Sequence, residues 1–303
     1  MSENLITLFD FANAVKESLQ EKYPTAKITI NKVIKNNDEC LLGITITEHE
    51  SNIAPNIYIN DYYDAYMNEK ITVDEVAVSV QKVYNTACKS NDLLNLDTSC
   101  FTDRDKLLGK VIIKLFGKEF NEEFLKDAVY ETVLDDLAAV IYVYIDSNER
   151  GLMTSKLQPK HLEKLGIDEE ELFEAALKNT ANLFPAKICN MSEIVVGMGK
   201  DALPYDDFPM YVATNSDSIN GAAVCLYPGL FKKFSEEHNL GNLYILPSSV
   251  HEIIILPESI GSDVDYLKEM VEDVNASVLV DKDILSNSLY RYDYETDTVS
   301  KIK

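Results

Sequence analysis

The chain has 303 residues, and 51 Asp and Glu against 28 Lys and Arg give it a formal net charge of −23 at pH 7. Every third of the chain is net acidic, whereas a surface that binds nucleic acid needs clustered Lys and Arg to neutralise phosphates, so we expect no nucleic-acid partner. Hydrophobic residues make up 46% and charged residues 26% of the chain. This balance is typical of a globular protein and excludes a disordered chain.

The distribution of apolar residues predicts a cytoplasmic protein with no membrane partner. The longest apolar runs have the length of single strands, whereas a membrane-spanning helix needs about 20 apolar residues. The first twenty residues contain Glu3 and Asp10. They lack both the basic start and the apolar run of a signal peptide.

The cysteines and histidines predict no metal and no cofactor. The five cysteines are odd in number and widely spaced, and they form no CxxC pair. We expect them to be free and mostly buried thiols. The four histidines form no HxxxH or HExxH pair of the kind that binds zinc.

The first third of the chain predicts a domain with the order α-β-β-β-α-α at 1–95. Apolar residues recur at helical spacing near the start, and short runs rich in β-branched residues follow. A polar stretch at 90–103 without a clear period predicts the boundary. The expected helices are 5–22, 61–67 and 73–90, and the expected strands are 27–34, 40–47 and 56–60.

The remaining residues predict a larger C-terminal domain at 104–303. Its strands come in clusters and do not alternate strictly with helices, so the fold class is α+β, with two mixed α/β domains and mainly antiparallel sheets. The expected strands are 110–116, 128–133, 137–145, 193–196, 210–214, 242–246, 251–256, 288–295 and 298–302. The expected helices are 119–126, 158–165, 168–183, 228–237 and 263–274.

The turn at 248–252 contains residue types that could catalyse hydrolysis. An imidazole oriented by a carboxylate can activate a hydroxyl, so Ser248 or Ser249 could attack with His251 as base. His251 and Glu252 are neighbours, and neighbouring side chains of an extended chain point to opposite faces. The carboxylate that orients the imidazole would therefore belong to a residue other than Glu252. Alternatively, the serines bond to the backbone of a strand connection, and His251 is a polar residue at the end of a strand.

The segment at 215–220 directly follows a predicted strand and is rich in Asn, Asp and Ser. Asn215, Asp217 and Asn220 could bind a ligand through their side chains and the backbone N–H groups around them. The same residue types also form ordinary turns.

Four strings of the sequence resemble an uncharacterised family from anaerobic Gram-positive bacteria, a domain of unknown function. They are INKVIKNN, PNIYINDYYDAY, YVATNSDSINGAAVCLYPGLF and YILPSSVHEIIILP. The layout from residue 139 to 185 is also similar to that of a second uncharacterised bacterial family. The resemblance implies a cytoplasmic bacterial protein, but no reaction, cofactor or partner. Its motif positions are Asn215, Asn220, Gly221, Tyr227, Pro228, Pro247, Ser248, Ser249, His251 and Glu252.

Taken together, these patterns favour a non-enzymatic binding or regulatory protein. Its recognition surface would include Asn215, Asp217, Asn220, His251 and Glu252, and its partner would be another protein or a small ligand. The alternative is a hydrolase that uses Ser248 or Ser249 with His251. A third hypothesis is an acidic decoy that occupies the groove of a nucleic-acid-binding protein.

Overall fold

The computed structural model describes residues 6–48, 54–89, 99–148, 151–197, 209–261, 263–277 and 279–303. The chain divides into two compact units, Met1–Asp97 and Thr98–Lys303. The predicted boundary at 90–103 lies mostly outside the described residues. Both units combine helices with antiparallel sheets, which confirms the predicted α+β class. Among the described residues, no helix has the length and apolar character that crossing a bilayer requires.

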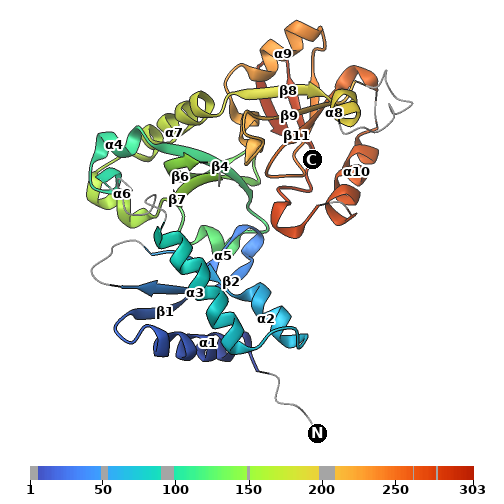
Figure 1. Ribbon diagram of the computed structural model, residues 1–303. Coiled ribbons are helices and arrows are strands. Elements are labelled where there is room, and N and C mark those ends of the chain that lie inside the picture. The colour runs from blue at the N-terminus through green and yellow to red at the C-terminus, as the bar shows by residue number, and fades with distance from the viewer. Residues whose placement is uncertain are drawn as a thin grey trace. The chain divides into compact units, whose positions relative to one another are not determined.

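The elements of the first unit follow one another as α-β-β-β-α-α, and its three strands form an antiparallel sheet in the order β1-β2-β3. Figure 1 labels β1 and β2 of this sheet together with the three helices of the unit. Its first helix begins where the sequence supplies a cap, because the Thr7 hydroxyl oxygen accepts the N–H of Asp10 at 3.1 Å. The elements are α1 (Leu8–Lys22), β1 (Lys27–Ile34), β2 (Cys40–Thr47), β3 (Asn56–Tyr58), α2 (Asn60–Met67) and α3 (Val73–Lys89).

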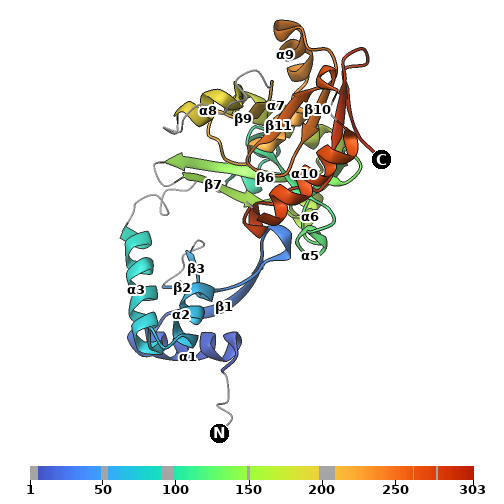
Figure 2. The same cartoon turned by 90° about the vertical axis from the view of Figure 1, so that its right-hand side faces the viewer.

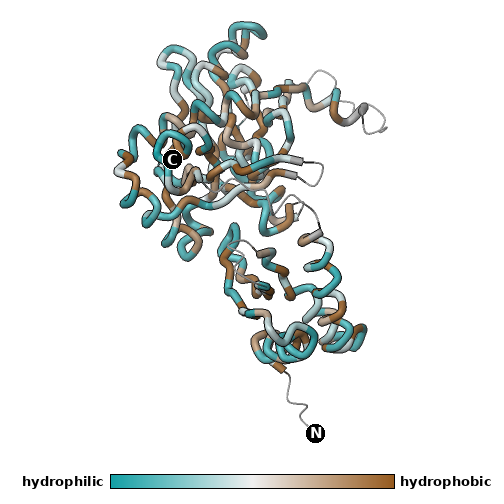
Figure 3. Tube along the Cα trace, turned by 60° about the vertical axis from the view of Figure 1, so that its left-hand side comes forward, coloured by the Kyte–Doolittle hydropathy of each residue, from teal (hydrophilic) through white to brown (hydrophobic). Residues whose placement is uncertain are grey.

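The core of the first unit forms between the sheet and the helices. Alternate strand residues such as Ile44 and Ile46 are fully buried, because side chains along a strand alternate between its two faces. Hydrophobic and hydrophilic residues alternate along the helices (Figure 3). The rings of Tyr63 and Tyr66 on α2 lie 5.5 and 4.9 Å from that of Phe11, so these tyrosines belong to the core packing.

The second unit begins with a four-stranded sheet, in which β6 pairs with β4 on one side and with β5 and β7 on the other. Helix α7 packs against β4 (Figure 1). There the buried Thr180 hydroxyl accepts the N–H of Ile113 at 2.8 Å. The sequence predicted neither α4 nor β7. The elements are α4 (Arg104–Leu108), β4 (Val111–Gly117), α5 (Glu122–Leu125), β5 (Tyr130–Val133), β6 (Leu137–Asn148), β7 (Gly151–Lys156), α6 (Pro159–Leu165) and α7 (Glu169–Leu183).

A six-stranded antiparallel sheet completes the second unit, in the order β13-β12-β10-β11-β9-β8. Figure 2 shows β9, β10 and β11 side by side. The longer elements are β8 (Ala186–Asn190), α8 (Met191–Gly197), β9 (Tyr211–Asn215), α9 (Leu230–His238), β10 (Leu243–Leu246), β11 (Ile253–Pro257), α10 (Val264–Ser277), β12 (Tyr290–Asp293) and β13 (Thr298–Lys301).

The strand predicted at 193–196 is wrong, because those residues lie in helix α8. The strand of this region is β8, just before it, and it pairs with β9. The side-chain oxygen of Asn190 accepts the N–H of Ser192 at 2.9 Å, so the chain turns from strand to helix at that residue.

A polar cluster joins the two sheets of the second unit around Asp136, in the turn between β5 and β6. Its carboxylate accepts hydrogen bonds from the Ser288 hydroxyl at 2.7 Å, from Lys301 Nζ at 2.8 Å and from the Tyr290 hydroxyl. Burial alone would raise the pKa of Asp136, but these three donors outweigh burial and lower it. Burial, together with the bond to Asp136, raises the pKa of Tyr290.

All five cysteines are free, as predicted, but most of them are not buried. Only Cys100 and Cys225 are buried, whereas Cys40 and Cys88 are exposed and Cys189 is partly exposed. Cys40 opens an exposed strand end and Cys88 lies in the last turn of α3, so their place in the fold overrides the usual tendency of cysteine to be buried.

Candidate functional site

The second sheet brings the two predicted site segments together. Residues 215–220 follow β9, residues 247–252 connect β10 to β11, and β9 pairs with β11 in the register Ala213 to Ile253. Because of this register, the Thr214 hydroxyl donates to the backbone oxygen of His251 at 2.7 Å. The N–H of Ala222 donates to the oxygen of Val250 at 3.2 Å.

A third segment, at 283–285, completes this arrangement. The N–H of Val250 donates to the oxygen of Asp283 at 2.9 Å, and the N–H of Leu285 donates to the oxygen of Ser248 at 2.8 Å. Between these bonds, Ser249 and Ile284 form an antiparallel bridge. We call residues 214–221, 247–252 and 283–285 the loop junction.

Asn215 shapes the loop that follows β9. Its side chain is 4% exposed, and its Oδ1 accepts the N–H groups of Asp217 at 3.1 Å and Ile219 at 3.3 Å. Its Nδ2 donates to the oxygen of Ile219 at 2.9 Å. Ser218 and Asn220 take the left-handed conformation that such a tight loop requires. The Asn215 amide is therefore used within the loop, while residues 216–219 are exposed.

The imidazole of His251 lies between the loop and Asp283. Its Nδ1 accepts the N–H of Asn220 at 3.2 Å, and its Nε2 lies 3.5 Å from Oδ1 of Asp283. Both side chains are partly exposed, at 33% and 30%. A nitrogen that accepts an N–H carries no proton, so the neutral ring holds its proton on Nε2, which faces the carboxylate.

The two serines have backbone roles at the junction. The Ser249 hydroxyl oxygen accepts the N–H of His251 at 3.0 Å, and both Ser248 and Ser249 are buried. Within the described residues, no hydrogen bond joins the imidazole to either hydroxyl. The carboxylate that faces the imidazole belongs to Asp283. Glu252, the residue after His251, is partly exposed. In this geometry, neither serine hydroxyl therefore makes the hydrogen bond to the imidazole that the hydrolase hypothesis requires.

Gly221 ends the loop where it passes closest to the neighbouring segments. A Cβ at this position would lie 2.1 Å from Oγ1 of Thr214, 2.4 Å from the backbone oxygen of His251 and 2.8 Å from the N of Asn215. Two of these three atoms belong to the backbone and cannot rotate away. A glycine is therefore needed for the loop to lie against residue 251.

Sequence reasoning did not assign roles to Thr214 and Asp283. Thr214 was part of a predicted strand, and Asp283 is one of many acidic residues in an acidic chain. Both join the loop junction only through the strand register and through a segment that is distant in sequence. No local pattern gives that information.

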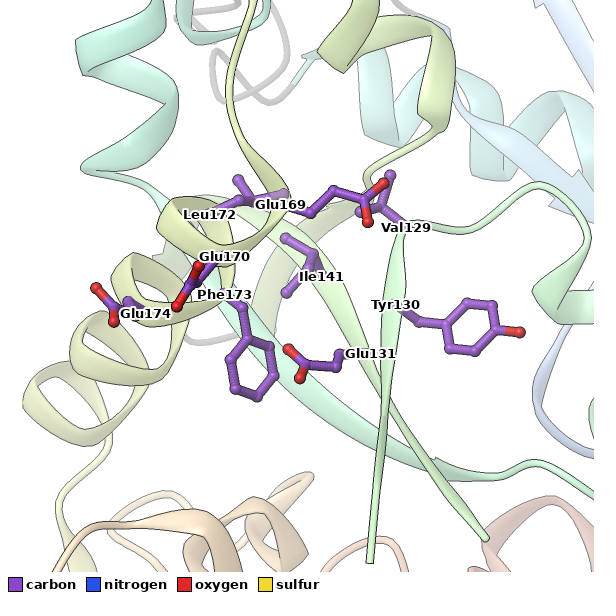
Figure 4. Close-up of a pocket in the computed structure, with 9 residues that line it drawn as sticks. All are labelled: Val129, Tyr130, Glu131, Ile141, Glu169, Glu170, Leu172, Phe173 and Glu174. Atoms are coloured by element: carbon purple, nitrogen blue, oxygen red, sulfur yellow. The ribbon is translucent and has the colours of Figure 1, made fainter. Parts of the chain in front are cut away.

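The second unit also contains a cavity, away from the loop junction. It lies between β5 and α7 and has a volume of about 550 Å³ (Figure 4). Acidic residues fill the first turn of α7, where the helix dipole favours them. The acidic Glu131 of β5 lies opposite them across the cavity, and no local pattern of the sequence indicates that placement.

A model for a family described as "Family of unknown function (DUF5688)" matches residues 8–294. The chain belongs to this family. The match to DUF5688 spans both units and includes the whole loop junction. It confirms the predicted membership of a domain family of unknown function, whereas the bacterial range remains a prediction. No curated protein and no solved structure matches the chain.

Proposed function

We propose that this DUF5688 protein is a non-enzymatic binding protein that recognises another protein through the loop junction. The observation that carries the proposal is the 215–220 loop. Its backbone is held by buried Asn215 and by His251, while residues 216–219 are all exposed. Exposed loops on a rigid scaffold are where binding residues concentrate.

Preorganisation gives the loop an energetic advantage in binding. Ordering a flexible side chain or loop at an interface costs about 0.5–1.5 kcal/mol for each immobilised side chain. The bonds from Asn215, together with the bond from Asn220 N–H to His251, fix the backbone before any partner arrives. A partner therefore meets a loop that is already in one conformation.

The exposed side chains indicate the chemistry of the partner surface. Ile219 is 44% exposed, although aliphatic side chains are usually buried. Exposed Asp217 and partly exposed Glu252 lie in the same junction and carry negative charge. We expect a partner with a small apolar depression for Ile219 and basic residues around it, because such an arrangement complements both features.

Affinity purification with a matched pair of variants tests this proposal. Ile219→Ser removes the exposed side chain of the loop, and Leu183→Ser removes one of similar exposure, 45%, at the end of α7. We expect the wild type and Leu183→Ser to retain the same protein from a native lysate, and Ile219→Ser to lose it. Thermal melts of both variants would check that they fold. Equal retention by all three proteins would contradict the proposal.

A further inference from the structure

The cavity between β5 and α7 has an apolar floor and one aromatic wall. Val129, Ile141 and Leu172 form the floor, and they are 9%, 2% and 1% exposed. The N–H of Ile141 donates to the oxygen of Val129 at 2.9 Å, so a backbone bond fixes two of these residues. The ring of Phe173 lies at the side of α7 that faces β5 (Figure 4). The volume of the cavity, about 550 Å³, lies within the range of roughly 300–1,000 Å³ that is typical of small-molecule sites.

Four carboxylates from two separate elements surround this apolar floor. Glu131 comes from β5, and Figure 4 shows its carboxylate pointing toward Phe173, while Tyr130 points to the other side of the strand. The other three, from α7, are Glu169, Glu170 and Glu174.

All four side chains are exposed to solvent, and no cation of the described residues pairs with them. Across the described residues, none of the four forms an ion pair or a side-chain hydrogen bond, whereas the neighbouring Glu171 pairs with Arg104 at 2.6 Å. The dipole of α7 favours acidic residues in its first turn. It gives no reason for Glu131, which lies on a strand opposite the helix. The cavity therefore combines an apolar floor with a rim of four exposed glutamates that form no ion pair with any described residue.

We propose that this cavity binds a small aliphatic polyamine. Its methylene chain would lie on the apolar floor, and its ammonium groups would bind the carboxylate of Glu131 and those of α7. The Phe173 ring would add a cation–π contact, because ammonium groups are attracted to the face of an aromatic ring. Carboxylates on both sides of the cavity suit a ligand with more than one positive charge. This site uses no residue of the loop junction, so the test of the polyamine site is independent of the test of the proposed function.

Calorimetric titration of the full chain with spermidine at 150 mM salt tests the assignment. We expect saturable binding of one spermidine per chain. Glu131→Gln should weaken it about five- to tenfold, because a charge-assisted hydrogen bond is lost at an exposed position. Phe173→Leu should weaken it about threefold, because it keeps the apolar volume but loses the ring. Glu272→Gln on α10 removes the same charge outside the cavity and should leave the affinity unchanged.

Three results would overturn the assignment. The first is equal weakening by Glu131→Gln and Glu272→Gln, which would indicate that spermidine binds the general negative charge of the chain. The second is the absence of saturable binding at 150 mM salt by a wild type that melts normally. The third is binding of a lysine-rich peptide that depends on Glu131 when spermidine does not bind, which would assign the cavity to a protein segment.

Discussion

Replacing Gly221 with Ala tests the packing of the loop junction directly. The added methyl group would lie 2.1 Å from Oγ1 of Thr214 and 2.4 Å from the backbone oxygen of His251. The Thr214 side chain can rotate, but only by giving up its bond to that same oxygen. Moving the backbone of residue 251 would in turn strain the bond from Asn220 N–H to the imidazole. Overpacking of this kind costs about 1–3 kcal/mol.

The assay is thermal unfolding of the full chain. A loss of about 1–3 kcal/mol should lower the Tm of the second unit by roughly 2–12 °C, since each kcal/mol corresponds to about 2–4 °C at this size. Gly109→Ala is the matched control, because its φ of −73° suits alanine and its Cβ would lie 3.4 Å from the nearest atom. That variant should be neutral or slightly stabilised. Equal Tm values for the wild type and Gly221→Ala would refute the packing described here.

Three further predictions follow from the second unit and from the cysteines. The folded pKa of Asp136 is below its ordinary value of 3.8, so this carboxylate stabilises the fold above pH 3.8, and that stability is lost as the pH falls toward the folded pKa. As the pH is lowered, the urea midpoint of Asp136→Asn should therefore fall less steeply than that of the wild type, and parallel curves would contradict this. Asp168 accepts the N–H groups of residues 170 and 171 as the cap of α7, so Asp168→Ala should cost about 1 kcal/mol in urea unfolding, and an unchanged midpoint would argue against the cap. A thiol reagent should modify the exposed Cys40 and Cys88 at once and Cys225 only after unfolding, because burial raises the pKa of the Cys225 thiol to about 12. Rapid reaction of Cys225 in the native state would contradict its burial.

The sequence was most informative where local signals agreed. Strands β1 and β2 coincide with the predicted runs at 27–34 and 40–47, because β-branched residues alternate there between polar turns. The strands of the β12–β13 hairpin and of the β10–β11 pair were also predicted. At 193–196 the β-branched composition was misleading, because the side chain of Asn190 begins a helix there.

The candidate site could be predicted only in part. The sequence indicated the 215–220 and 248–252 segments by their turn residues, but turn chemistry does not tell which polar groups face solvent. The structure uses Asn215, Ser249 and His251 largely to hold the backbone, and it leaves Ile219 exposed. The cavity between β5 and α7 was not foreseen, because its acidic residues come from elements that are adjacent only in the folded protein.

Hydrogen–deuterium exchange of the full chain, with and without the protein retained in the affinity purification, tests the proposed binding surface most directly. Before the partner is added, the amide of Asn220 should be protected by its bond to His251. With the partner bound, we predict added protection at 216–219 and around residue 252, since these exposed residues would be covered. Added protection confined to other parts of the chain would contradict the assignment of the loop junction as the recognition surface.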